Sequence, residues 1–224
     1  MLLVKKMKKI MIKENDANQR IDKYLKKLLC NASSNFIYKM FRKKDIKING
    51  TRVNEKYILQ KGDVLEMFLY EDKFNELTKE KDIYQLKREF KILYEDKNIL
   101  IVDKPVGLLV HGDANENVNT LSHQVLSYLK EKGELDISRE STFIPGPVHR
   151  LDRNTSGIVI FGKTLVALQD LNEMMKKRHH IEKSYMTICK GKLIKKQELV
   201  GYVKKIENED RVRFVKKDDK DALM

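Results

Sequence analysis

The chain has 224 residues and a mass of 26.4 kDa, which is enough for one substantial core or for two modest domains. It carries 46 Lys and Arg against 33 Asp and Glu, and this net charge of +13 favours a polyanionic partner, either a nucleic acid or an acidic membrane surface. Two cysteines without C-x-x-C spacing exclude a disulfide framework and a cysteine-rich zinc site, so we expect a reducing, cytoplasmic setting.

The first 70 residues hold most of the positive charge, with 17 Lys and Arg against 7 Asp and Glu. Apolar residues recur at helical spacing in "NQRIDKYLKKLLC" and again in "FIYKMFRKK", and Ser33 or Ser34 is placed to cap the second helix. Solvated lysines account for the basic face of any single helix, but the charge of the whole segment favours RNA or DNA. The candidate RNA-binding residues are Arg20, Lys39, Arg42, Lys43 and Lys44.

A small sheet is predicted after these helices. Residues 45–54 alternate Ile46 and Ile48 before Asn49-Gly50, the dipeptide typical of a two-residue hairpin, and residues 61–70 supply another strand. We therefore expect an extension over residues 1–17 and a basic module over 18–70. Residues 71–90 mix both charge signs and lack Gly and Pro, which favours a linker before a second domain over 91–224.

The second domain is predicted to combine helices with a mixed or antiparallel sheet, an α+β architecture. Strands are expected on both sides of the turn "EDKN", before the Pro-Gly turn at 104–107, and in "GIVIFG". Helices are expected in "TLSHQVLSYLKEKG" and "TLVALQDLNEMMKKRHH". The alternation in "EKSYMTICKG" predicts a further strand.

Residues 157–164 match G-x-x-x-x-G-K-[ST], the phosphate-binding loop of nucleotide hydrolases. Such a loop needs small residues between its glycines, whereas this segment holds Ile, Val, Ile and Phe, which favour a buried strand. We therefore expect Lys163 to end a strand and Thr164 to cap the next helix. A phosphate-loop hydrolase would instead bind a triphosphate through Lys163.

The segment "HRLDRNTSG" places Asp152 between Arg150 and Arg153 in a turn that leads into this strand. The adjacent guanidinium groups favour the ionised carboxylate, which suits a nucleophile or a base. From spacing alone, a salt bridge that merely orders the turn accounts for Asp152 better, because no second acid or histidine is visibly arranged with it.

The stretch "GPVHRLDRNTSGIVIFGKT" resembles the H-R-L-D-x-x-T-S-G signature of RluA-type RNA pseudouridine synthases, including the RluC- and RluD-like members. Residues 18–69 resemble the S4-like RNA-binding domain that precedes the catalytic domain in this family. "LYEDKNILIVDKPVGLLVH" is similar to the first catalytic motif, and "EKSYMTICKG" to the K-x-Y motif. The resemblance covers most of the chain.

The resemblance implies that the chain isomerises chosen uridines to pseudouridine, in large-subunit ribosomal RNA above all, without cofactor, metal or ATP. It implies that Asp152 is the essential carboxylate, acting either as nucleophile or as base, and that Tyr185 is the active-site tyrosine. Arg150 would fill the space vacated by the flipped base. We expect a monomer that binds RNA and binds neither a membrane nor a nucleoside triphosphate.

Residues 211–224, "RVRFVKKDDKDALM", resemble the segment that leads into the next strand of the family's catalytic sheet. Family members usually continue into an R-x-H-Q-[IL]-R motif, which does not occur in this sequence. We expect a catalytic domain that is incomplete at its C-terminus, with weak or no activity alone. The alternative function is therefore that of a non-catalytic RNA-binding fragment.

Overall fold

The structure, a computed structural model, describes residues 7–78, 83–113, 118–138, 140–177, 180–192, 194–196, 198, 200–206 and 212–216. Parts of three predicted segments lie outside the described residues: 1–6 of the extension, 79–82 of the linker and 217–224 of the second domain. The chain forms two compact units, Met1–Glu182 and Lys183–Met224. The first unit contains both the basic module and most of the second domain.

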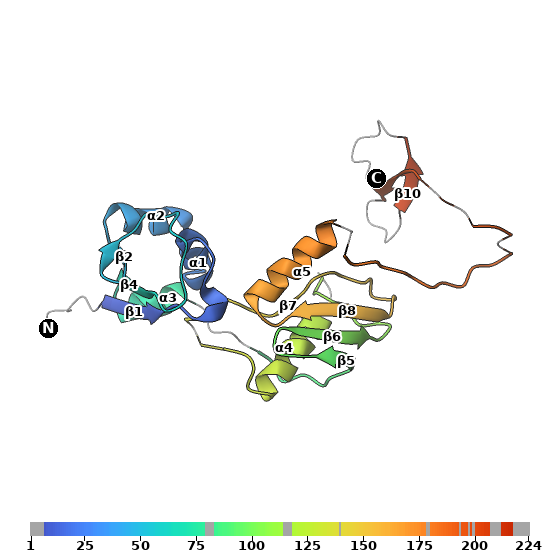
Figure 1. Cartoon of the computed structure of the whole chain (residues 1–224), viewed down its shortest axis with the longest axis horizontal. Helices are drawn as coiled ribbons and strands as arrows, with labels where there is room; N and C mark the ends of the chain where they lie inside the picture. Colours follow the sequence, from blue (N-terminus) through green and yellow to red (C-terminus); the bar gives the residue numbers. More distant parts are fainter. Residues whose placement is uncertain are drawn as a thin grey trace. The chain divides into compact units, whose positions relative to one another are not determined.

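The basic module is a four-stranded antiparallel sheet covered by helices (Figure 1). Its strands lie in the order β1-β4-β2-β3. The bounds are β1 Met7–Met11, β2 Ile46–Ile48, β3 Thr51–Arg52, β4 Val64–Phe68, the short 3-10 helix Glu14–Asp16, α1 Ile21–Leu28 and α2 Ser34–Arg42. Both predicted helices, the hairpin at Asn49-Gly50 and the following strand are thus confirmed.

The module has one feature set by local sequence, the cap of α2, and one set by a distant strand, the pairing of β1. The Ser33 hydroxyl accepts a hydrogen bond from the backbone N–H of Phe36, which satisfies one of the free donors at the start of α2. Strand β1, which lies in the predicted extension, pairs along its whole length with β4, and Ile10 is 2% exposed. The sheet therefore begins before residue 18.

The predicted linker contains a helix, α3 Glu71–Leu77. Phe74 and Leu77 are 1% and 6% exposed and belong to the core of the basic module. Two apolar residues three positions apart lie on one side of a helix, so a short segment packs here although its overall composition is charged. The boundaries proposed at residues 70 and 90 stay predictions.

The second domain has an antiparallel sheet in the order β5-β6-β8-β7, which confirms the α+β class. Helix α4 lies along one face of this sheet (Figure 1), where Leu121, Val125 and Leu129 pack with inward residues of β6 and β8. The bounds are β5 Lys91–Glu95, β6 Ile99–Lys104, α4 Leu121–Glu131, β7 Gly146–Pro147, β8 Gly157–Gly162 and α5 Leu165–Lys177. These elements follow the predicted order.

Residues 157–162, the first six of the phosphate-loop pattern, form strand β8, as the sequence predicts. Gly157 has a φ of 128°, a conformation that favours glycine. A Cβ added to Gly162 would lie 2.6 Å from the Cα of Leu168, so this glycine is needed where α5 approaches the strand. The Thr164 hydroxyl accepts a hydrogen bond from the N–H of Ala167, which confirms it as a cap.

One predicted strand is wrong. Residues 182–191 contain no strand, and Met186 and Ile188 in this segment are 99% and 100% exposed. A strand is stabilised by hydrogen bonds to a neighbour, and among the described residues no neighbouring strand pairs with this segment. The second unit has instead a hairpin of β9 Tyr202–Lys205 and β10 Val212–Val215.

The two parts of the first unit are joined by buried polar contacts. The carboxylate of Asp16, which is 2% exposed, accepts hydrogen bonds from the backbone N–H and the hydroxyl of Thr142 at 2.9 and 2.6 Å. The hydroxyl of the buried Tyr24 donates to the carbonyl of Glu140 at 2.9 Å. These bonds satisfy groups that would otherwise be costly to bury, so they hold the 140–142 loop against the basic module.

The ion pairs around Glu95 and Lys163, just before α5, make the stability of the fold depend on pH. Burial raises the pKa of Glu95, but hydrogen bonds from Tyr128, Lys163 and Lys132 outweigh it and lower that pKa from 4.5 to about 2. A carboxylate with a lowered pKa stabilises the fold above its unfolded pKa, and this stabilisation is lost as the pH falls toward the folded pKa.

We expect Glu95→Gln to lower the free energy of unfolding at pH 7 by, at most, on the order of 3 kcal/mol. The difference from the unaltered chain should shrink as the pH falls from 4.5 to about 2. Urea unfolding at a series of pH values measures it. A difference that stays constant over this range would contradict the assignment.

Candidate active site

The loop between β7 and β8 presents Asp152 to solvent. Asp152 is exposed, whereas the neighbouring Leu151 is buried in the core of the sheet domain. The carbonyl of Asp152 accepts a hydrogen bond from the N–H of Thr155 at 3.1 Å, which closes the turn before β8 begins. An exposed carboxylate is thereby held at the rim of a rigid sheet, the placement that suits a reactive group.

A buried lysine supports this loop from below. Lys104, the last residue of β6, is 0% exposed and pairs in register with Gly157 at the start of β8. Its ammonium donates hydrogen bonds to the carbonyls of Pro105 at 2.9 Å, Leu108 at 2.7 Å and Arg153 at 3.2 Å. Lys104 thus ties the Pro-Gly turn to the residue that follows Asp152.

The charges of Lys104 and Asp152 act on each other. Burial lowers the pKa of Lys104, and the negative charge of Asp152 partly opposes that effect. Lys104 therefore places a fixed positive charge within electrostatic reach of the exposed carboxylate. A nucleophile or a base needs an ionised carboxylate. This arrangement favours a chemical role for Asp152.

The sequence prediction gave Lys104 no role beyond a turn, although one signal was present. Leu100 and Val102 are inward residues of β6, and Lys104 follows them at the same two-residue spacing. Side chains two positions apart in a strand point to the same face, so a lysine in this register had to be buried.

The two arginines beside Asp152 behave differently. Arg150 is exposed, and its positive charge lowers the pKa of His111, which belongs to the loop that follows β6. The carbonyl of Arg153 accepts a hydrogen bond from the N–H of Gly107 at 2.9 Å, and its guanidinium lies 3.6 Å from the carboxylate of Asp113. Arg153 therefore joins this loop to the turn that carries Asp152.

Tyr185, the third predicted site residue, lies in the second unit and is 66% exposed. It belongs to the segment that was predicted as a strand and is not one. Asp152 and Arg150 lie in one loop of the first unit, whereas Tyr185 lies in the second unit. The roles of all three residues stay predictions.

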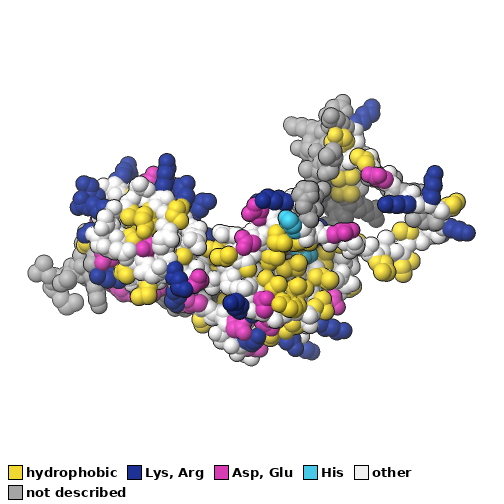
Figure 2. All heavy atoms as spheres, viewed as in Figure 1, with side chains coloured by type: hydrophobic (Ala, Val, Ile, Leu, Met, Phe, Trp, Pro, Cys, Tyr) yellow, Lys and Arg dark blue, Asp and Glu magenta, His cyan; other side chains and the backbone are white. Residues whose placement is uncertain are grey.

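The predicted RNA-binding residues lie mainly around the end of α2. Lys39, Arg42, Lys43 and Lys44 are all exposed. Figure 2 shows Lys and Arg side chains gathered on the part of the basic module where Figure 1 places α2. Arg20 differs from them, because its guanidinium donates two hydrogen bonds to the carboxylate of Asp22 at 3.0 and 2.9 Å. An arginine paired in this way has fewer donors left for phosphate.

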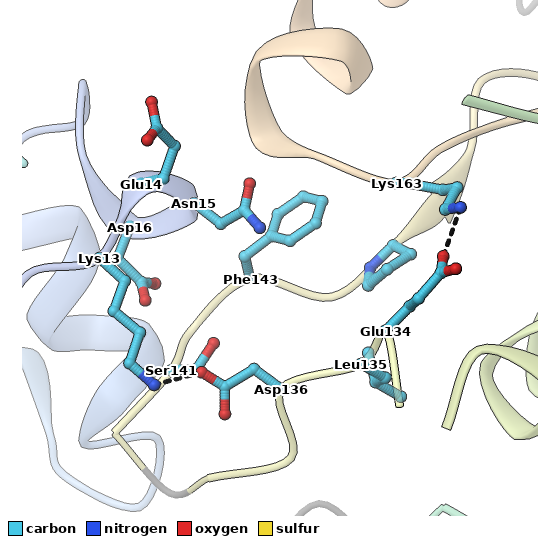
Figure 3. A pocket seen from close by; sticks show the side chains of 11 residues that line it. Lys13, Glu14, Asn15, Asp16, Glu134, Leu135, Asp136, Ser141, Phe143 and Lys163 are labelled. Carbon is cyan, nitrogen blue, oxygen red and sulfur yellow. Dashed lines mark hydrogen bonds and ion pairs between the residues drawn. The ribbon is translucent and has the colours of Figure 1, made fainter. Parts of the chain in front are cut away.

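A small cavity of about 100 Å³ lies elsewhere in the first unit (Figure 3). The two lysine ammonium groups that line this cavity already have carboxylate partners. That of Lys13 lies 2.7 Å from the carboxylate of Asp136, and that of Lys163 contacts Glu134. Asp152 does not line it. Among the described residues, no three His, Cys, Asp or Glu side chains are grouped to hold a metal ion, and no helix is long and apolar enough to span a bilayer.

Comparison with known proteins finds a matching family for each of the two parts of the chain. Residues 98–223 match the model of the RNA pseudouridylate synthase family, and residues 19–65 match the S4 domain. An uncharacterized RNA pseudouridine synthase from Mycoplasma capricolum is 39% identical over 183 residues, which are 81% of this chain and 59% of that protein.

Two further relatives are described as ribosomal large subunit pseudouridine synthase C. The protein from Pasteurella multocida is 32% identical over 83% of this chain and 54% of its own length, and that from Buchnera aphidicola is 34% identical over 81% and 54%. The chain thus spans between half and two thirds of the length of these relatives. Since the family model covers more than half of the chain, and includes the loop that carries Asp152, the chain belongs to the RNA pseudouridylate synthase family and has an N-terminal S4 domain.

Proposed function

We propose that the chain isomerises specific uridines of large-subunit ribosomal RNA to pseudouridine, with Asp152 as the essential residue. The observation that carries the proposal is the exposed carboxylate on a turn that is fixed by β8 on one side and by the buried Lys104 on the other. Family membership supports the reaction type. The names of the relatives from Pasteurella and Buchnera support ribosomal RNA as the substrate.

The proposed reaction breaks the bond between N1 of uracil and the ribose, rotates the base and joins C5 to the same ribose carbon. C5 then gives up its proton and N1 takes one up, so the product is an isomer of the substrate. Asp152 either attacks the anomeric carbon or removes a neighbouring ribose proton, and both roles need the ionised carboxylate. A uridine in folded RNA must first leave its stack, and the exposed Arg150 fills the vacated space. Tyr185 stacks against the uracil.

RNA binding is assigned to the S4 domain, and in particular to the exposed cations around the end of α2. Binding of such cations to RNA is favoured because it releases the counterions of the phosphate backbone. The protein acts as a monomer in the cytoplasm, where its ribosomal substrate is found.

A second function is favoured by a specific observation. Tyr185 lies on an exposed segment of the second unit, and among the described residues no strand pairs with that segment. In this second function the chain binds RNA through its S4 domain without converting it. Binding without conversion therefore distinguishes this function from the first.

Pseudouridine mapping tests the proposal. Large-subunit ribosomal RNA and bulk transfer RNA, both free of pseudouridine, are incubated with the chain and mapped. We expect conversion at one or a few uridines of the ribosomal RNA. Conversion in transfer RNA alone would overturn the substrate, and binding of ribosomal RNA with no conversion in either RNA would favour the non-catalytic function.

The cations after α2 should set the salt dependence of RNA binding. We expect the triple variant Arg42→Ala, Lys43→Ala, Lys44→Ala to bind RNA more weakly. Each lost phosphate contact lowers the slope of log affinity against log salt by about 0.7 for single strands, so the slope should fall by up to about 2. Filter binding at several salt concentrations measures it.

A matched control removes the same charge from the second domain. Lys91, Lys97 and Lys176 are also exposed, and their triple alanine variant should change the slope by less than half as much. Equal losses in the two variants would show that net charge, and not the face around α2, governs binding.

A further inference from the structure

His111 lies in the segment 107–113, whose two ends contact Arg153 in the loop that carries Asp152. It follows the buried Val110 and stands between Gly107 and Asp113, the two residues that contact Arg153 through a hydrogen bond and an ion pair. The charge of Arg150 also reaches it. His111 is therefore bracketed by two contacts to Arg153, yet it has no part in the function proposed above.

The hydrogen bonds of Ser122 determine which nitrogen of His111 carries a proton. The Ser122 hydroxyl donates its single proton to the carbonyl of Val110 at 2.7 Å. Its oxygen also lies 3.2 Å from Nδ1 of His111, and with the hydroxyl proton already used, that contact needs a proton on Nδ1. In the neutral ring the lone pair is then on Nε2.

The surroundings keep this ring neutral. Burial, the charge of Arg150 and the nearby His123 all lower the pKa of His111 below its ordinary value of 6.5. Among the described residues, no donor is found for Nε2. At neutral pH this atom is thus an acceptor at the edge of the loop.

We propose that Nε2 of His111 accepts a hydrogen bond from a ribose 2′-hydroxyl of the bound RNA. A phosphate oxygen has no proton to donate, whereas every ribonucleotide carries a 2′-hydroxyl and deoxyribonucleotides lack it. The contact makes His111 a residue that distinguishes RNA from DNA at the Asp152 loop. The inference rests on the proposed function, since it needs RNA at this loop.

A double-mutant cycle tests the contact. Binding of a uridine dodecamer and of the matching 2′-deoxyuridine dodecamer is measured for the unaltered chain and for His111→Phe, which removes the acceptor. We expect the unaltered chain to prefer the ribose form, and His111→Phe to lower that preference by about threefold to tenfold, the range of one hydrogen bond. Because every nucleotide of the dodecamer is a uridine, a uridine lies at the site in any binding register.

Two further variants separate this contact from a structural role. His111→Gln retains a side-chain acceptor and should keep part of the preference for the ribose dodecamer. Ser122→Ala no longer fixes which nitrogen of the His111 ring carries the proton. It should lower this preference by less than His111→Phe does. A loss in His111→Phe that is equal for both dodecamers would overturn the inference and leave RNA binding by the chain intact, and it would point instead to a contact with the base. Failure of the unaltered chain to bind either dodecamer would contradict the proposed function and the inference together.

Discussion

Replacing Asp152 by asparagine is expected to abolish uridine conversion while the chain still folds and binds RNA. Asparagine has nearly the same shape, but it is neutral and can act neither as nucleophile nor as base. Loss of such a group in other enzymes lowers the rate by about 10⁴ or more, and we expect a fall of that order in single-turnover conversion of ribosomal RNA. Because Asp152 is exposed, the free energy of unfolding should change little.

The control for this variant is Asp113→Asn, which neutralises a second carboxylate beside the same loop. Asp113 lies 3.6 Å from the guanidinium of Arg153 on the protein surface, where an ion pair contributes about 1 kcal/mol or less. Its conversion rate should stay within about tenfold of that of the unaltered chain. If Asp152→Asn also stays within this range, Asp152 is not the essential residue.

Replacing Lys104 by methionine should have the largest effect on stability. Methionine keeps most of the length of the side chain, so the variant removes the charge and the three hydrogen bonds with little change in packing. Three carbonyls, one of them on the buried Leu108, then lose a charged donor, and we expect the free energy of unfolding to fall by about 3 kcal/mol. Urea unfolding followed by circular dichroism measures it.

The matched control is Lys97→Met, at an exposed position of the turn between β5 and β6, and its effect should lie within about 0.5 kcal/mol. Conversion by Lys104→Met should also fall at temperatures where the variant is still folded, because the turn next to Asp152 loses its anchor. A variant as stable as Lys97→Met would show that the three bonds to Lys104 do not hold the loop.

Elements with local signals could be predicted from the sequence. The cap at Ser33, the turn at Asn49-Gly50 and the strand 157–162 each depend on residues within a few positions of one another, and the structure has all three. The strand expected over 182–191 had an equally clear alternation. It fails because a strand also needs a partner, and a partner is a property of the fold and not of the segment.

Only part of the candidate site could be predicted from the sequence. The turn that carries Asp152 could be located from its polar residues and its family signature, but spacing alone favoured a simple salt bridge. The support of that turn comes from Lys104 of β6, which is 49 positions from Arg153 in the sequence. The acceptor on His111 depends on how Ser122 of α4 uses its proton. No pattern in the sequence expresses contacts of this kind.

The two glycines of β8 show that a short sequence motif can match for reasons unrelated to the function it suggests. Gly157 satisfies a backbone angle and Gly162 satisfies the approach of Leu168, so the five-residue interval between them reflects two unrelated steric demands. A pattern search counts the pair as one signal, whereas the protein can lose one without the other. A related chain whose α5 sits farther from the sheet would tolerate a side chain at the second position and still require glycine at the first, and its resemblance to a nucleotide-binding motif would vanish with no change in chemistry.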